Sequence, residues 1–291
     1  MKNKLVSVII PTYRTNNSLE KAIESALRQT YENIEIIVVD NNEPNTPERT
    51  LAQKIIKKYS RHKNVRYMLS DKIKNGSAAR NLGASCATGH YVAFLDDDDY
   101  YYEDKIRKQI DKMLQTGAMF CVCYYKKNGR TYKFQSRKDY TKNILVRKKV
   151  PQTSSFIMEK KLFDAVGGFD DTFSRHQDLE FLIRICQMAK VATIRQPLYE
   201  RTHNGVDNRV NAKELEKIKH KYINKYKYLY KKYNLSTEVI NSIQYSQVII
   251  TYLKQGDKKN AMRLFMEQNR LLVTLEIIRE LLYLTWAKIN A

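Results

Sequence analysis

Short apolar runs alternate with helically periodic segments over the first hundred residues. Short runs rich in Val and Ile are typical of buried strands, whereas apolar positions at helical spacing are typical of amphipathic helices. These patterns predict strands at 5–10, 34–39, 65–69 and 90–95, separated by helices at 17–27, 48–59 and 77–87. Such an alternation predicts an α/β fold in which helices flank a largely parallel sheet.

The middle of the chain continues the alternation, and the composition changes after Gly205. Patterns there predict a helix at 102–114, a strand at 118–125, a basic hairpin or loop at 126–142, a helix at 178–188 and a strand at 191–194. Beyond Gly205, apolar positions at helical spacing are interleaved with lysines. We therefore expect two domains, residues 1–205 and a basic α-helical extension at 206–291.

Polar residues follow three of the predicted strands. They are Pro11-Thr12-Tyr13, Asp40-Asn41-Asn42 and the four consecutive carboxylates of Asp96 to Asp99. Ligands of open α/β sheets bind at the carboxyl ends of the strands. These groups are far apart in sequence, and we expect them to meet in space.

The acidic run is the most distinctive of these strand ends. If the extended conformation continues through it, Asp96 and Asp98 point the same way, because alternate strand residues share a face. Paired carboxylates suit Mg²⁺ or Mn²⁺, which are usually completed by substrate phosphates. The alternative is a solvated acidic turn, in which four like charges would repel one another.

The chain is strongly basic, with a net charge of +21 and a pI near 9.6. A surplus of this size implies an acidic partner, such as a nucleic acid, an anionic membrane or a phosphorylated substrate. No nucleic-acid-binding module is recognisable, and that class leaves the four carboxylates unexplained. We therefore expect no nucleic-acid partner.

Cysteine usage and hydropathy predict a cytoplasmic protein. The four cysteines form no CxxC pair and are interpreted as buried thiols in a reducing compartment. The first apolar run stops at Pro11, which is too short for a signal peptide. The most apolar stretch, residues 271–287, is interrupted by charges, so no spanning helix is expected.

Four blocks together resemble the family 2 glycosyltransferases of the GT-A fold, over roughly residues 6–205. The blocks are Val6 to Tyr13 with Ile36 to Asp40, Asn75 to Gly83, Phe94 to Asp99, and Gly167-Gly168-Phe169-Asp170 followed by Arg175-His176-Gln177-Asp178. The resemblance is to enzymes of bacterial surface-polysaccharide synthesis. The Gln-x-x-Arg-Trp motif of processive members is absent, so single-sugar addition is expected.

The resemblance implies a nucleotide-sugar donor, with UDP-sugar expected, and a GT-A domain at residues 1–205. It assigns a donor-binding role to Pro11, Thr12, Tyr13, Asp40, Asn75, Arg80, Asp96 and Asp97. The first three would line the uracil and ribose pocket, and Asp40 would accept hydrogen bonds from the base. The alternative for Asp40 is a helix N-cap. Arg80 would clamp the diphosphate or brace the acidic run, because a guanidinium suits either.

The resemblance also implies a metal and a general base. Asp98 would bind Mn²⁺ or Mg²⁺ directly, and His203 would contact the metal or diphosphate, or be only structural. Asp178 would take the acceptor proton in a single displacement that inverts the anomeric configuration. The family has Glu-Asp where this chain has Gln177-Asp178. A helix N-terminus would lower the pKa of Asp178, whereas burial and nearby carboxylates would raise it.

The acceptor is expected to be a glycan or lipid-linked glycan, bound near Thr153, Ser154 and Gln177. The basic tail, with apolar positions Leu271, Leu275, Ile278 and Leu282, could bind an anionic membrane peripherally. It could instead cap the first domain or form a homo-oligomer interface. A nucleotidyltransferase on a related sheet and an inactive membrane scaffold remain the rival functions.

Overall fold

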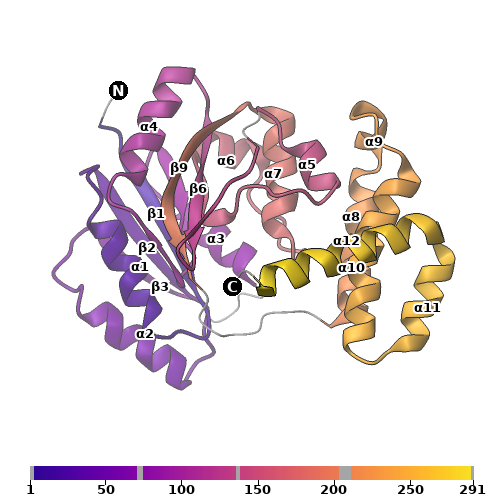
Figure 1. Ribbon diagram of the computed structural model, residues 1–291. Helices are drawn as coiled ribbons and strands as arrows, with labels where there is room; N and C mark the ends of the chain where they lie inside the picture. The colour runs from indigo at the N-terminus through magenta and orange to yellow at the C-terminus, as the bar shows by residue number, and fades with distance from the viewer. Residues whose placement is uncertain (1–2, 71–74, 136–137, 203–210, 290–291) are drawn as a thin grey trace. The chain divides into compact units, whose positions relative to one another are not determined.

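The computed structural model describes residues 3–70, 75–135, 138–202 and 211–289 (Figure 1). The chain divides into two compact units. The first comprises residues 1–141 and 149–206, and the second comprises residues 142–148 and 207–291. The expected boundary after residue 205 did not include the short segment 142–148 in the second unit.

A nine-stranded mixed sheet forms the centre of the first unit, in the order β3-β2-β1-β4-β8-β6-β9-β5, with β7 paired to β6. The strands are β1 Val6–Thr12, β2 Ile34–Asp40, β3 Val65–Leu69, β4 Tyr91–Phe94, β5 Asp99–Tyr101, β6 Phe120–Lys127, β7 Arg130–Tyr132, β8 Ile157–Glu159 and β9 Val191–Arg201. Strands β3, β2, β1 and β4 are mutually parallel, whereas β8 is antiparallel to β4 and β6. The predicted α/β fold with a mixed sheet is confirmed, and its parallel pairs are β3-β2, β2-β1, β1-β4 and β6-β9.

Helices cover both faces of this sheet. They are α1 Ser18–Leu27, α2 Pro47–Lys57, α3 Gly76–Ser85, α4 Lys105–Thr116, α6 Lys160–Val166 and α7 Gln177–Met188, with the short 3₁₀ turn η1 Thr153–Ser155. The short helix α5 Thr141–Leu145 belongs to the second unit except for its first residue. The apolar sides of α1, α2 and α4 pack on Val8, Ile36 and Ala93. Neighbouring strand residues point to the opposite face, where Phe94 meets Phe163 of α6.

Gly83 explains how closely α3 approaches the sheet. A Cβ atom at this position would lie 2.5 Å from Ile9 Cγ2 and 3.1 Å from Val39 Cγ2. Only a glycine allows this separation, because a methyl group needs more room than that. The close packing places the N-terminal half of α3 near the carboxyl ends of β1 and β2.

Strand β9 is longer than the sequence pattern indicated. It runs to Arg201, and its second half pairs with β5 through Tyr100 opposite Glu200 and with β6 through Lys126 opposite Glu200. The hydrophobic pattern did not predict this half of the strand because several of its residues are polar. The extension carries residues 201 and 202 to the acidic run.

Helices α8 Ala212–Tyr226, α9 Tyr228–Lys232, α10 Thr237–Lys254, α11 Lys258–Glu267 and α12 Arg270–Ile289 form the second unit. Tyr245, Val248 and Ile249 of α10 pack in its core with Leu215 of α8 and Leu264 of α11. The predicted helical C-terminal part is confirmed. Among the described residues, no helix is both long and apolar enough to cross a bilayer.

Segment 142–148 is fastened to α10 by hydrogen bonds. Gln244 Nε2 donates to the Leu145 carbonyl at 2.8 Å, and Arg147 Nη1 donates to the Ile243 carbonyl at 3.0 Å. Lys219 Nζ of α8 donates to Gln244 Oε1 at 2.8 Å, so a buried polar chain joins the segment to two helices. These partners are distant in sequence, which is why no local pattern predicted the association.

Candidate active site

The ends of β1, β2 and β4 meet at one edge of the sheet, as the topology predicted. Thr12 pairs with Asp40 in register, and Thr12 Oγ1 donates a hydrogen bond to Asp97 Oδ2 at 2.5 Å. Thr12 and Asp40 are buried, whereas Tyr13 is 49% exposed. An exposed aromatic ring beside a buried polar cluster offers a stacking surface for a planar group.

The acidic run forms a turn and does not continue the strand. Strand β4 ends at Phe94, and the Asp99 amide donates to the Asp96 carbonyl at 3.0 Å. The condition for Asp96 and Asp98 to share a face is therefore not met. Asp96 pairs with Arg80, with 2.5 Å between Oδ1 and Nη2, while Asp97 faces Thr12.

Asp99, which sequence reasoning did not select, anchors the end of this turn. Its Oδ2 accepts from Ser154 Oγ at 2.6 Å and its Oδ1 accepts from the Thr202 amide at 3.1 Å. Thr202 Oγ1 also donates to the Asp98 carbonyl. These contacts tie the turn to the end of β9, immediately before His203, which lies outside the described residues.

Negative charge is concentrated in this turn. Burial, with the charges of Asp98 and Asp96, raises the pKa of Asp97 to about 7 despite the hydrogen bond from Thr12. Burial and the same two charges raise the pKa of Asp99 well above its ordinary value. A bound cation would relieve this repulsion, and hard carboxylate oxygens suit Mg²⁺ or Mn²⁺. Over the described part of the chain, no three His, Cys, Asp or Glu side chains group as a metal site.

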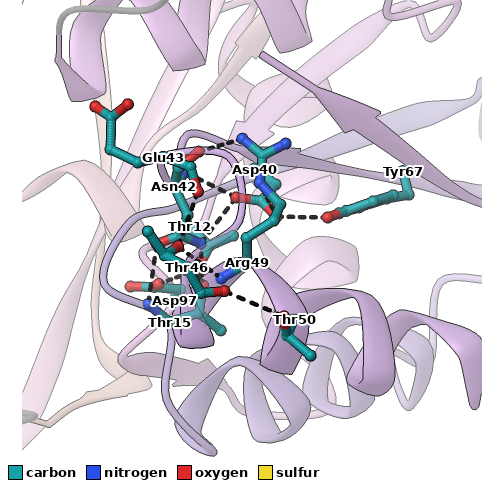
Figure 2. Close-up of polar contacts among 10 residues, drawn as sticks. All are labelled: Thr12, Thr15, Asp40, Asn42, Glu43, Thr46, Arg49, Thr50, Tyr67 and Asp97. Atoms are coloured by element: carbon teal, nitrogen blue, oxygen red, sulfur yellow. Dashed lines mark hydrogen bonds and ion pairs between the residues drawn. The ribbon is translucent and has the colours of Figure 1, made fainter. Parts of the chain in front are cut away.

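Asp40 lies at the centre of a buried cluster (Figure 2). Its Oδ2 accepts from Tyr67 and lies 3.2 Å from Arg49 Nε, while its Oδ1 accepts from Asn42 N and Nδ2 at 2.8 Å each. Three hydrogen bonds and the charge of Arg49 thus hold this carboxylate inside the protein. Hydrogen bonding of Asp40 to a base stays a prediction.

A chain of hydrogen bonds joins this cluster to the acidic turn (Figure 2). Asn42 Nδ2 donates to Thr15 Oγ1 at 2.7 Å, and Thr15 Oγ1 lies 2.7 Å from Thr12 Oγ1. Because Thr12 gives its single hydroxyl proton to Asp97, Thr15 is the donor to Thr12. The ends of β1 and β2 therefore hold Asp97 through a directional relay.

Arg80 is buried beside the acidic turn, with 7% of its surface exposed. Only Nη2 contacts Asp96, and Nε and Nη1 are buried without a hydrogen-bond partner in the described residues. A Cβ at Gly76 would lie 3.1 Å from Arg80 Nη1 and 3.7 Å from Gln177 Nε2. Gly76 therefore leaves room where the first turns of α3 and α7 meet. Of the two roles predicted for Arg80, bracing the acidic run is observed.

The loop before α7 is held against α3 by two asparagines. Asn75 Oδ1 accepts from the Ala78 amide as the N-cap of α3, and its Nδ2 donates to the Asp171 carbonyl at 2.7 Å. Asn81 exchanges two hydrogen bonds of 2.8 Å with the Phe169 backbone. These contacts position the start of α7 beside Arg80.

Asp178 lies in the first turn of α7 and is half-buried. Burial raises its pKa above the ordinary value, although the Leu179 amide and the charges of Arg80 and Arg201 lower it, and the charge of Asp96 raises it further. Of the two opposing effects expected on the pKa of Asp178, burial outweighs the helix N-terminus. A carboxylate with a raised pKa is a stronger base.

Residues 7–182, more than half of the chain, match the family described as Glycosyl transferase family 2. The chain belongs to this family. This glycosyltransferase is 27% identical over 258 residues to the amylovoran biosynthesis glycosyltransferase AmsB of Erwinia amylovora, covering 81% of this chain and 84% of that protein. The predicted family and enzyme class are confirmed.

Other relatives are matched over part of their length. An uncharacterized glycosyltransferase of Rickettsia felis is 40% identical over 129 residues, which are 44% of this chain but 20% of that protein. The UDP-Glc:alpha-D-GlcNAc-diphosphoundecaprenol beta-1,3-glucosyltransferase WfgD of Escherichia coli is 30% identical over 150 residues, 50% of this chain and 57% of that enzyme.

Solved structures share the fold of this glycosyltransferase. The structure of S. aureus TarS 1-349 in complex with UDP-GlcNAc superposes with a TM-score of 0.61 at 18% identity. The match covers 86% of this chain and 73% of that chain. At this identity the likeness shows the fold, and it confirms the predicted GT-A architecture.

The residues predicted to contact the acceptor differ in how far they are exposed. Ser154 is only 1% exposed. Its Oγ donates a hydrogen bond to Asp99 Oδ2 and accepts one from the Asp96 amide at 3.1 Å. Thr153 is also buried, whereas Gln177 is half-buried at the start of α7. Ser154 thus supports the acidic turn from within the protein, and the acceptor roles of Thr153, Ser154 and Gln177 stay predictions.

Several structural partners of the site were missed by sequence reasoning. They are Thr15, Asn42, Arg49, Tyr67, Asp99, Arg201 and Thr202. Asn42 and Asp99 belong to the polar strand ends singled out in the sequence, and that position was their available signal, although no role was assigned to either. The others carry common polar side chains whose partners are set by tertiary contacts.

Proposed function

We propose that this protein is a metal-dependent, inverting glycosyltransferase that moves one sugar from a UDP-sugar to a hydroxyl of a lipid-linked or polysaccharide glycan. The observation that carries the proposal is Arg80. Two of its buried guanidinium nitrogens have no hydrogen-bond partner in the described residues, beside a turn of four aspartates. A buried cation with unused donors suits a diphosphate, which offers several acceptor oxygens.

The acidic turn supports a divalent cation at Asp98. Asp98 is half-exposed in the turn, and its charge raises the pKa of both Asp97 and Asp99, so a cation there would relieve repulsion. We assign Asp98 as the protein ligand for Mn²⁺ or Mg²⁺, and His203 remains a predicted second ligand. Such an ion would supply positive charge against the leaving diphosphate. Arg80 contributes a second, fixed positive charge that would also stabilise the leaving diphosphate.

Asp178 is the proposed general base. Its raised pKa and its nearness to the charges of Arg80 and Asp96 support this role. It removes the proton of the acceptor hydroxyl, whose oxygen attacks the anomeric carbon opposite the diphosphate. One displacement inverts the anomeric configuration. Gln177 keeps hydrogen-bonding capacity but no charge, so one acid performs this step.

The relatives support the substrate classes. The name of WfgD specifies UDP-glucose and a diphosphoundecaprenol-linked acceptor, and AmsB is named for biosynthesis of the polysaccharide amylovoran. The TarS structure contains UDP-GlcNAc. By analogy with these proteins, we propose that this chain uses a UDP-sugar donor and a glycan acceptor. The donor sugar is left to the experiment below.

The decisive experiment separates donor binding from transfer. Calorimetry should show UDP binding in the presence of Mn²⁺ for the wild type and for Asp178→Asn. A panel of UDP-sugars identifies the donor through slow Mn²⁺-dependent hydrolysis. Transfer to an undecaprenyl-diphosphate-linked sugar should fall by about a thousandfold or more in Asp178→Asn, because its base is lost. Full transfer by this variant would refute the assignment.

Two further variants test the donor site against a control. Arg80→Gln and Asp98→Ala should each weaken Mn²⁺-dependent UDP binding at least about tenfold, because charge-assisted contacts are lost. Asp164→Asn, at an exposed ion pair with Lys160 on α6, should bind as the wild type does. If UDP affinity is unchanged both by Asp98→Ala and by removal of Mn²⁺, the proposed metal site is excluded. A protein without hydrolysis or transfer for any UDP-sugar would instead be the inactive scaffold.

A further inference from the structure

Helix α12 carries apolar residues on two opposite faces. Val273 is fully buried, and Ile277 packs with it in the core of the second unit. Leu271, Leu275, Ile278 and Leu282 are exposed by 69%, 54%, 47% and 65%. Their spacing of four, three and four residues places them on one stripe along the helix. A helix that only capped a core would need the first face alone.

Helix α11 repeats this arrangement on a smaller scale. Ala261 and Leu264 are buried, whereas Met262 and Met266, one turn apart, are exposed by 61% and 56%. These two methionines and the four aliphatic residues of α12 make up half of the exposed large hydrophobic side chains described in the protein. Soluble monomers scatter such residues singly, so their concentration on two successive helices marks a contact surface.

The charge of the protein identifies the partner. Residues 211–291 contain fifteen Lys and Arg against seven Asp and Glu, and the whole chain carries +21. A second copy would bring the same positive charge to the contact and be repelled. A bilayer containing anionic phospholipids offers apolar depth and a negative surface together.

We propose that the outer stripe of α12, with Met262 and Met266 of α11, inserts into the interfacial region of an anionic phospholipid bilayer. The helix would lie in the plane of the surface, since apolar side chains enter from one face only. This docking goes beyond the transfer reaction and does not depend on the identity of the donor or of the acceptor.

The test uses the full chain and vesicles of phosphatidylcholine with 30% phosphatidylglycerol, or of phosphatidylcholine alone. The wild type should float with the anionic vesicles and bind them at least tenfold more tightly than the neutral ones. Trp286 is the only tryptophan of the chain, so a change in its emission on adding anionic vesicles gives a second readout of binding.

Matched variants separate the stripe from general hydrophobicity. Leu275→Gln/Leu282→Gln should lose at least tenfold in vesicle affinity, with an unchanged thermal melt and unchanged UDP-sugar hydrolysis. Leu69→Gln/Met188→Gln, at two equally exposed apolar positions of the first unit, should bind vesicles like the wild type.

Three results would overturn the proposal. They are equal affinity of the two double variants, absence of flotation by the wild type, and self-association without vesicles that Leu275→Gln/Leu282→Gln abolishes. The last would identify the stripe as a dimer contact. Since hydrolysis is measured separately, failure of membrane docking leaves the proposed reaction standing, and the reverse also holds.

Discussion

Ser154→Ala removes one oxygen atom that joins both ends of the acidic turn. Ser154 Oγ donates to Asp99 Oδ2 at 2.6 Å and accepts from the Asp96 amide at 3.1 Å. The site is fully enclosed, so water cannot replace the lost hydroxyl without rearrangement. The substitution therefore leaves a buried carboxylate and a buried amide each one partner short.

The expected cost follows from these two losses. An unsatisfied buried polar group costs about 1–3 kcal/mol, and more when it is charged. We expect Ser154→Ala to lower the free energy of unfolding by about 3 kcal/mol and the melting temperature by roughly 5–10 °C. The hydrogen bond from Ser154 lowers the pKa of Asp99, so its loss should favour the protonated carboxyl.

The functional effect should exceed that of general destabilisation. Asp98 lies between the two anchored residues, so a loosened turn should weaken Mn²⁺-dependent UDP binding about tenfold, measured by calorimetry well below the melting temperature. Ser155→Ala is the matched control, because Ser155 is equally buried but donates only to the Gln152 carbonyl at 2.6 Å. It should lose about 1 kcal/mol and keep UDP affinity.

Equal UDP affinity in Ser154→Ala and the wild type would refute the reasoning, since the two anchors would then not determine the geometry of the turn. Equal loss of affinity in both serine variants would also count against it. That outcome would assign the effect to η1 as a whole.

Two other substitutions test the core that supports the site. Burial lowers the pKa of Lys105 to about 8 from 10.5, so the folded state binds fewer protons than the unfolded chain between these values and stability rises with pH there. Urea unfolding should show the wild type gaining about 2 kcal/mol relative to Lys105→Met between pH 7.5 and 9.5, and parallel curves would contradict this. Gly83→Ala should cost about 1–3 kcal/mol because its methyl group overlaps Ile9 and Val39. Ser85→Ala, at an exposed position of α3, should hardly change the free energy of unfolding. Equal melting temperatures of Gly83→Ala and Ser85→Ala would contradict the close packing inferred at Gly83.

The predictions that held depend on short-range order or on topology. Apolar periodicity located β1, β2 and α3, because strand and helix side chains alternate with fixed periods. Parallel strands end at a common edge, so the meeting of Thr12, Asp40 and the acidic run followed from their order alone. The hairpin β6–β7 also agrees with one of the two interpretations of the basic segment.

The predictions that failed depend on the geometry of a few residues. The condition for a shared face of Asp96 and Asp98, an extended run, is replaced by a turn at Asp97 and Asp98. Neighbouring carboxylates therefore meet Arg80, Thr12 and Ser154. Ser154 is a buried anchor of this turn, which the sequence did not predict, and its acceptor role stays a prediction. Residues far apart in sequence set these pairings, and no local pattern encodes them.

The sequence by itself determined the family, the order of the elements and the residue types at the strand ends, because these follow from local periodicity and motif spacing. Only the tertiary structure decided which partner each polar side chain has. It enclosed Asp40 with Tyr67 and Arg49 and turned an apolar stripe of α12 outward. It also left two nitrogens of Arg80 without a hydrogen-bond partner among the residues that the structure describes. Burial and hydrogen bonding are properties of the folded surroundings, and a side chain acquires them only when distant segments pack around it.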